Sequence, residues 1–254
     1  MRGRKSTRNH TVASQLFGAT VFLACILTFS LIAAQSLYSQ LNQPRQAQKI
    51  SERAHRIQES GTDYAGWLKV GGTDISLPLV QAHEDDGTAW FLSHDPEGKP
   101  SCLGSAFIDS RCNLESQHIM IFAHNSWTTN SMFSPIAECW KQDRFDSLQA
   151  AMVRTKDGRE LTFRPLCSLR VDKSYADIQH FRFGSDHDYS AWISKLLQDA
   201  RSMGAVRGSP ETMCATTDQA LSLVTCSNKV PGRPERTIVL FIRQDTEVAK
   251  GGYS

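Results

Sequence analysis

Three side chains suited to cysteine-based acyl transfer stand at the ends of three predicted strands. Residues 221–226 are apolar and β-branched and end in Cys226, and Arg236 opens another apolar run ten positions later. Upstream, residues 118–123 form a strand-like run that is followed directly by His124. A guanidinium beside a thiol lowers the pKa of the thiol and can bind an oxyanion, and a histidine can exchange the proton. The sequence therefore predicts a nucleophile at Cys226, a general acid–base at His124 and an oxyanion-binding group at Arg236.

Each of these assignments has a plainer alternative. A lone cysteine flanked by apolar residues is most often a core residue, and a lone histidine is more often packed or capping than catalytic. Arg233 is close enough to Cys226 in the sequence to compete with Arg236, which we prefer because it enters the strand directly. The joint presence of three chemically matched groups favours catalysis over these separate explanations.

No metal or cofactor site is predicted. Four histidines could imitate a metal cluster, but their spacing matches no helical H-x-x-x-H pair; they are His83, His94, His118 and His124. Asp95 and Asp109 are expected in turns or on the surface rather than as catalytic carboxylates.

The elements that position the reactive groups are predicted to be mainly strands. Period-two and apolar runs predict strands, and a glycine turn at 71–74 predicts a hairpin between the first two; the runs are 67–70, 75–80, 104–109, 118–123, 161–171, 221–226 and 237–242. Residues 132–136 suggest a short helix or turn. Apolar residues at helical spacing predict an amphipathic helix over 188–200, capped at Ser185-Asp186 and ended at Gly204. This helix is an insertion before the cysteine strand.

The N-terminal region is predicted to anchor the chain in a membrane. Residues 1–15 are basic, and residues 16–34 are a 19-residue stretch without a charge. As a helix, such a stretch is about 28 Å long, close to the hydrocarbon thickness of a bilayer. Basic residues before it predict a cytoplasmic N-terminus and an extracytoplasmic remainder. The alternative is a cleaved signal peptide, which also exports the rest of the chain.

The exported part divides into three regions. Residues 35–62 form a polar stalk in which Ile50, Ala54 and Ile57 predict a short amphipathic helix. The catalytic domain is expected over 63–245, with a tail over 246–254. The net charge of +2 gives no reason to expect a nucleic-acid partner. Besides Cys25 and Cys226 there are five cysteines and no C-x-x-C; a bridge from Cys102 to Cys112 is left open.

Several of these residues resemble a known family. The run Leu223-Val224-Thr225-Cys226, the arginine ten residues later and the run Ala123-His124-Asn125 resemble the sortases, the cysteine transpeptidases of Gram-positive cell surfaces. Other stretches are similar to class B sortases in particular. These are Gly66 to Val70, Thr73 to Ile75, Pro78 to Gln81, Phe91 to Asp95, Gly104 to Asp109 and the helix before the cysteine strand. The resemblance covers about 63–243.

The resemblance implies both a fold and an activity. The fold is a closed or nearly closed sortase-type β-barrel with peripheral helices and one N-terminal transmembrane helix. The activity is cleavage of the C-terminal sorting motif of a surface protein after its threonine, through a thioester on Cys226. The acyl group then passes to an amine on a peptidoglycan precursor or on a pilin lysine, without a cofactor. His124 and Arg236 are the implied catalytic partners.

The resemblance also suggests substrate contacts. Ser222 and Thr225 provide hydroxyls in Ser222-Leu223-Val224-Thr225-Cys226, where the family usually has Thr-Leu-x-Thr-Cys. Val224 departs from the serine that is common there in class B. Asn125 either contacts substrate or closes a local turn.

Two other functions stay open from the sequence. One is an exported cysteine peptidase or amidase of the papain type, although such chains place the cysteine before the histidine. The other is a catalytically inactive, sortase-like binding module.

Overall fold

A computed structural model describes residues 30, 52–57, 59–60, 63–84, 88–126, 130–208, 210, 218–228 and 232–243. The chain divides into two units, residues 1–53 and 54–254, and the architecture below is that of the second. The predicted segments 1–15, 16–34 and 246–254 lie outside the described residues, except for Ser30. Among the residues that are described, no helix has both the length and the apolar character needed to cross a membrane.

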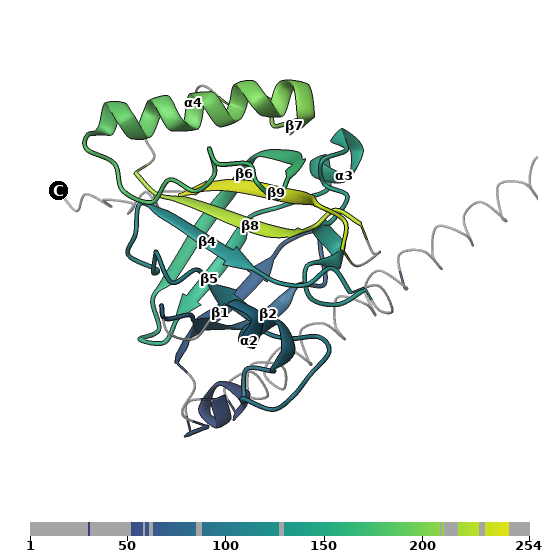
Figure 1. The fold of residues 1–254 in the computed structure, drawn as a ribbon, viewed down its shortest axis with the longest axis vertical. Helices are drawn as coiled ribbons and strands as arrows, with labels where there is room; N and C mark the ends of the chain where they lie inside the picture. Colours follow the sequence, from purple (N-terminus) through teal and green to yellow (C-terminus); the bar gives the residue numbers. More distant parts are fainter. Residues whose placement is uncertain are drawn as a thin grey trace, which may run out of the picture. The chain divides into compact units, whose positions relative to one another are not determined.

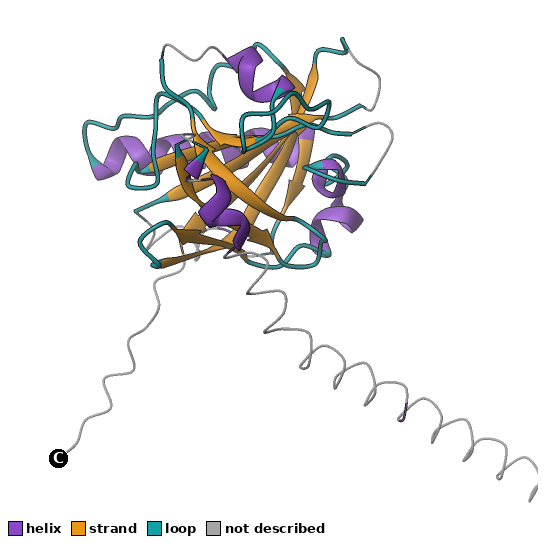
Figure 2. Ribbon diagram, turned by 90° about the horizontal axis from the view of Figure 1, so that it is seen from below, coloured by secondary structure: helices purple, strands orange, loops and turns teal. Residues whose placement is uncertain are grey.

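The second unit is mostly β (Figures 1 and 2). Its strands are β1 (Tyr64–Val70), β2 (Ser76–Gln81), β3 (Ala106–Ile108), β4 (His118–Phe122), β5 (Ala151–Thr155), β6 (Glu160–Asp172), β7 (Gly204–Val206), β8 (Ala220–Cys226) and β9 (Glu235–Arg243). Its helices are α2 (Thr88–Ser93), the 3-10 turn η1 (Ser134–Ile136), α3 (Gln142–Asp146) and α4 (Asp186–Met203).

The strands form one closed sheet. Their order in the described part of the chain is β5-β1-β2-β3-β4-β8-β9-β6-β7, and a further pairing of β5 with β6 closes the barrel. The pairs β2–β3 and β4–β8 are parallel, and all other pairs are antiparallel. Closure removes the unpaired edges that an open sheet would present. The short strand β7 is not part of the ring and pairs with β6. The predicted closed β-barrel is confirmed.

The long strand β6 makes closure possible because its two edges pair with different neighbours. On one edge its first residues pair with β5 across a turn at Gly158, whose φ of +90° suits glycine, and Cys167 to Leu169 pair with β7. On the other edge the strand pairs with β9 from Phe163 to Asp172. Strand β5 was not predicted, although its residues alternate between buried and exposed as in a half-buried strand.

Helix α4 confirms the predicted insertion. The Ser185 side chain accepts a hydrogen bond from the backbone N–H of Asp188, as an N-cap does, and the helix ends at Gly204. Its buried face packs on β6 and β7, and Figure 1 shows it lying along one side of the barrel. That face consists of Tyr189, Trp192, Ile193, Leu196, Leu197 and Ala200.

A second, smaller core lies around α2. Ile57, fully buried in a helical segment over 54–57, belongs to an apolar cluster with Phe91 and Phe107. The Phe91 and Phe107 rings stack with centroids 5.1 Å apart. The predicted amphipathic helix is therefore present at Ala54 and Ile57, and it packs on the domain; Ile50 lies outside the described residues.

Four cysteines of the described region are free thiols: Cys102, Cys112, Cys139 and Cys226. The possible bridge between Cys102 and Cys112 is therefore not formed. Burial raises the pKa of the Cys112 and Cys139 thiols to about 12, so both stay protonated and unreactive at neutral pH. Cys226 differs from these two because it is partly exposed.

Candidate active site

The ends of three adjacent strands meet at one edge of the barrel. Strands β4 and β8 are parallel and paired from His118 opposite Ala220 to Phe122 opposite Val224. The ladder continues one step further, because the Ala123 N–H donates to the Val224 carbonyl at 3.3 Å. Strand β9 runs back antiparallel, and its Arg236 pairs with Cys226.

The register places Cys226 and Arg236 on the same face of the sheet. Directly opposite residues on paired strands point to the same side, and Arg236 is directly opposite Cys226. His124 lies two residues beyond the last paired residue of β4, and the bond from Ala123 to Val224 brings it to the edge of the barrel where Cys226 ends β8.

A backbone carbonyl holds the His124 ring. Its Nε2 lies 2.8 Å from the carbonyl oxygen of Leu92, the next-to-last residue of α2. A carbonyl oxygen can only accept, so Nε2 is the protonated nitrogen and Nδ1 is the nitrogen that remains to exchange a proton. This contact was not predicted, because any residue can supply a backbone carbonyl and no residue type marks it.

A glycine leaves room for that carbonyl. Gly104 has a φ of +61°, and a Cβ placed on it would lie 2.6 Å from the Phe91 carbonyl oxygen and 2.9 Å from that of Leu92. The same segment also binds the end of α2, because the Ser105 N–H donates to the Phe91 carbonyl at 2.8 Å. The position of Leu92, and through it the orientation of His124, therefore depends on Gly104.

The Arg236 guanidinium is fixed by its own loop. Its Nη1 donates to the carbonyl oxygens of Arg233 at 3.0 Å and Glu235 at 3.2 Å. Within the described part of the chain, Nε and Nη2 make no hydrogen bond, so these donors are available to an incoming group. Arg233 thus helps to position the Arg236 guanidinium through its backbone carbonyl.

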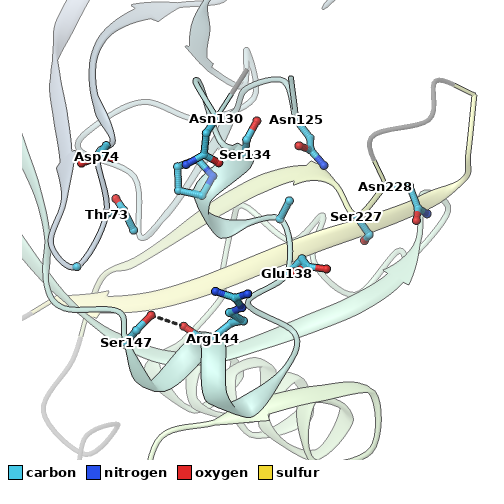
Figure 3. A pocket seen from close by; sticks show the side chains of 13 residues that line it. Thr73, Asp74, Asn125, Asn130, Ser134, Glu138, Arg144, Ser147, Ser227 and Asn228 are labelled. Carbon is cyan, nitrogen blue, oxygen red and sulfur yellow. Dashed lines mark hydrogen bonds between the residues drawn. The ribbon is translucent and has the colours of Figure 1, made fainter. Parts of the chain in front are cut away.

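Asn125 connects the histidine strand to the cysteine strand. Its Nδ2 donates to the Cys226 carbonyl at 2.9 Å, while its Oδ1 is buried without a hydrogen-bond partner among the described residues. Asn125 also lies on the wall of a polar pocket of about 510 Å³ together with Ser227 and Asn228, which follow the cysteine (Figure 3). The side chain is thus a structural link that also faces a cavity.

Thr225 and Ser222, two predicted substrate contacts, lie in the protein interior. The Thr225 hydroxyl donates to the Ala123 carbonyl at 2.8 Å and ties the two strand ends together. Ser222 is fully buried, with its hydroxyl 2.8 Å from Nε2 of His118. The predicted substrate contacts are therefore corrected: both hydroxyls are used in internal hydrogen bonds and have almost no exposed surface.

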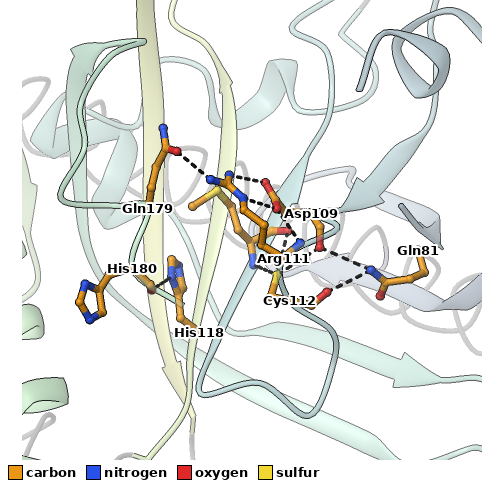
Figure 4. Close-up of polar contacts among 8 residues, drawn as sticks. Gln81, Asp109, Arg111, Cys112, His118, Gln179 and His180 are labelled. Atoms are coloured by element: carbon orange, nitrogen blue, oxygen red, sulfur yellow. Dashed lines mark hydrogen bonds and ion pairs between the residues drawn. The ribbon is translucent and has the colours of Figure 1, made fainter. Parts of the chain in front are cut away.

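His118 is the centre of a buried polar network (Figure 4). Its Nδ1–H donates to the His180 carbonyl at 2.8 Å, so Nε2 is the acceptor of the Ser222 hydroxyl. The ring contacts Phe181 and Trp192, with centroids 5.3 Å and 4.6 Å away. Burial is the main cause that lowers the pKa of His118 to about 4. The neutral ring thus joins β4 and β8 to the loop before α4 and to α4 itself.

An ion pair completes this network. Arg111 donates from Nε and Nη2 to the two carboxylate oxygens of Asp109, at 2.8 Å and 2.7 Å, and from Nη1 to Gln179 at 2.8 Å. Burial alone would raise the pKa of Asp109, but the hydrogen bonds from Arg111 hold it below its ordinary value. Asp109 is therefore a buried, ion-paired carboxylate just after β3, whereas a turn or surface position was expected.

No group of three or more metal-ligating side chains occurs in the part of the chain that the structure describes. The four histidines considered as a cluster have separate partners. His83 is hydrogen-bonded to Asp63, His118 to Ser222 and His124 to the Leu92 carbonyl. The His94 ring stacks on Trp90.

No family model matches the chain. Individual proteins are similar to it in sequence and in fold. Sortase B of Listeria monocytogenes is 26% identical over 97 residues, which are 37% of this chain and 38% of that protein. The sequence match thus spans about two fifths of that relative.

Solved structures of class B sortases have the same fold. Sortase B of Clostridium perfringens superposes with a TM-score of 0.62 at 22% identity, covering 77% of this chain and 100% of the other. Sortase B of Staphylococcus aureus gives 0.61 at 19% identity, covering 83% and 98%. A Streptococcus pyogenes class B sortase involved in pilus biogenesis gives 0.58 at 22% identity, covering 72% and 92%. The resemblance to class B sortases found in the sequence is confirmed.

His118 makes stability depend on pH in a defined window. An unfolded histidine has a pKa of about 6.5, whereas His118 in the fold has a pKa of about 4. As pH falls from about 6.5 to 4, the unfolded chain takes up a proton that the folded chain does not. We expect the free energy of unfolding to drop by about 3 kcal/mol over this range, measured by urea unfolding at several pH values.

The variant His118→Gln tests the source of this dependence. It should be less stable than the parent at pH 7 and lose most of the slope between pH 4 and 6.5. The exposed His187→Gln on α4 is the matched control and should keep the slope. An undiminished slope in His118→Gln would show that another group is responsible.

Gly104→Ala should disturb the active site through Leu92. The added Cβ moves the carbonyl that orients His124, so the imidazole should be less well placed to assist the reaction of Cys226. We expect about a tenfold slower alkylation of Cys226 by iodoacetamide at pH 6.5, followed by mass spectrometry of the Cys226 peptide.

Gly158→Ala is the control for backbone strain. Gly158 has a φ of +90° but nothing within 4 Å of an added Cβ. Both alanines should cost about 1 kcal/mol from the left-handed backbone, while only Gly104→Ala slows Cys226. Equal alkylation rates in the two variants would refute the role of Gly104.

Proposed function

We propose that this protein is a membrane-anchored class B sortase, a cysteine transpeptidase of the cell surface. It is supported most strongly by the pairing of Cys226 with Arg236 and by the parallel pairing of β4 with β8, which brings His124 to the same edge of the barrel. The fold shared with class B sortases and the sequence similarity to sortase B add to it.

In the proposed first step, Cys226 forms a thioester. The thiolate attacks the carbonyl carbon of the threonine in a C-terminal sorting motif, and a C–S bond forms. Because Nε2 of His124 is bonded to Leu92, the proton passes from Nδ1 to the departing nitrogen as the C–N bond breaks. Nε and Nη2 of Arg236 donate to the oxyanion of the tetrahedral intermediate.

In the proposed second step, an amine displaces the cysteine. The amine nitrogen forms a new amide bond, the C–S bond breaks, and Nδ1 of His124 takes the proton of the amine. The thiolate and the imidazolium are thereby restored. The acceptor is a peptidoglycan precursor or a pilin; the Streptococcus pyogenes neighbour is described as acting in pilus biogenesis.

The location follows from the sequence. We propose that 16–34 spans the cell membrane with residues 1–15 in the cytoplasm, and that the domain over 63–245 acts outside. The short helical segment at 54–57, packed on the domain, would connect the stalk to it.

The reaction is tested with sorting peptides. We would incubate the full chain in mild detergent with fluorogenic peptides of the Asn-Pro and Leu-Pro types and triglycine, and analyse the products by mass spectrometry. Cleavage after threonine with triglycine joined to the new end is expected. Cys226→Ala should abolish it, and His124→Ala and Arg236→Ala should each lower the rate at least about 100-fold.

Arg233→Ala is the matched control for Arg236→Ala. Arg233 supports Arg236 through its backbone carbonyl, which alanine retains, so its rate should stay within about twofold of the parent. Cleavage that survives Cys226→Ala would overturn the mechanism. Hydrolysis that never yields a triglycine adduct would assign the protein to the cysteine peptidases instead.

A further inference from the structure

The helical segment that precedes the barrel contributes one side chain to the interior of the domain. Within residues 52–57, Ile57 has no exposed surface, while the polar residues are exposed or only partly buried. The chain is fixed at this point, because the Ser60 hydroxyl donates to the Ile57 carbonyl at 2.7 Å. Ile57 is therefore the residue through which this segment is anchored to the domain.

A row of stacked rings lies in the same apolar cluster as Ile57 and connects α2 to the end of β4. Phe91 of α2 stacks on Phe107 of β3 with ring centroids 5.1 Å apart. Phe107 in turn stacks on Phe122, the last residue of β4, at 5.5 Å. Ile57 is a fully buried member of this cluster, and Phe122 packs against it. The volume that Ile57 fills therefore helps to set where α2 lies relative to β4.

The two ends of this row carry the partners of the hydrogen bond that orients His124. Leu92, whose carbonyl accepts that bond, follows Phe91, and His124 lies two residues after Phe122. Strand pairing holds the β4 end. Helix α2 has six residues, and a helix this short depends on packing for its position. The α2 end, and with it the Leu92 carbonyl, is therefore the end that moves if the cluster loses volume.

We propose that Ile57 is a positioning residue for His124, so that segment 52–57 must be packed on the domain for full activity. Removing the Ile57 side chain leaves a cavity, α2 relaxes toward it, and the Leu92 carbonyl moves away from Nε2 of His124. Without that acceptor the neutral ring carries its proton on either nitrogen, and fewer rings keep Nδ1 ready to take a proton. This inference rests on the proposed roles of His124 and Cys226, to which it adds a residue from outside the barrel.

The tautomer of His124 tests the proposal without relying on turnover. We would prepare the full chain with ¹⁵N-labelled histidine in mild detergent, assign the His124 signals with the variant His124→Gln, and record NMR spectra at about pH 8.5, where histidine is mostly neutral. The parent should show His124 protonated on Nε2 alone. Ile57→Ala should show both tautomers, with at least about a fifth of the rings protonated on Nδ1.

Two further variants keep the test decisive. Ile193→Ala removes the same atoms from an almost fully buried isoleucine on α4 in the larger core, and it should keep the single Nε2 tautomer. Ile57→Val loses less volume and should give a smaller Nδ1 fraction than Ile57→Ala. If Ile57→Ala does not fold, the comparison of Ile57→Val with the parent takes its place. A parent-like spectrum in the Ile57 variants, or mixed tautomers in Ile193→Ala, would overturn the proposal.

Turnover of the sorting peptides checks the consequence for activity. Ile57→Ala should lower kcat about tenfold and change KM less than about twofold, because proton transfer is misaligned while substrate binding is kept. Ile193→Ala should stay within about twofold of the parent in both constants. An unchanged kcat in Ile57→Ala would refute the requirement for a packed segment. Absence of cleavage in the parent would count against the transpeptidase, while the NMR spectra would still decide whether Ile57 positions His124.

Discussion

The parallel pairing of β4 with β8 is the constraint on which the candidate site depends. The two strands are not consecutive in the chain, and everything from η1 to β7 lies between them. Because side chains alternate along a strand, a shift of one residue in this register would turn the Cys226 side chain to the other face of the sheet. The hydroxyl of Thr225 fixes the register at the reactive end by donating to the Ala123 carbonyl. Strand β9 runs antiparallel to β8, and its pairing sets Arg236 opposite Cys226.

The same pair of strands is fastened at its other end by a different interaction. There the neutral His118 ring joins Ser222 to the loop before α4, and the ion pair of Asp109 and Arg111 supports that loop through Gln179. Buried polar groups of this kind destabilise a fold unless each one is hydrogen-bonded. Here His118, Ser222, Asp109 and Arg111 are all hydrogen-bonded. The two strands are therefore tied together at the end away from Cys226, while Cys226 itself is partly exposed.

The catalytic histidine depends on parts of the chain that contain no reactive group. Its orientation comes from a carbonyl in α2, whose position depends on a glycine in a left-handed conformation. Helix α2 in turn rests on the stacked rings of Phe91 and Phe107, with Ile57 beneath them. A segment outside the barrel thus contributes to the geometry at Cys226 through ordinary apolar packing.

The sequence by itself determined the local features: most strands, the capped helix α4, and the chemical types of Cys226, His124 and Arg236 at strand ends. These follow from periodicity, capping and residue chemistry, which act over a few neighbouring residues. Only the tertiary structure decided what depends on distant pairing. It assigned Ser222 and Thr225 to internal hydrogen bonds, closed the barrel through β5, and brought the Leu92 carbonyl to His124. Backbone groups and register have no signature in a single sequence, because they depend on which strands meet and at which step.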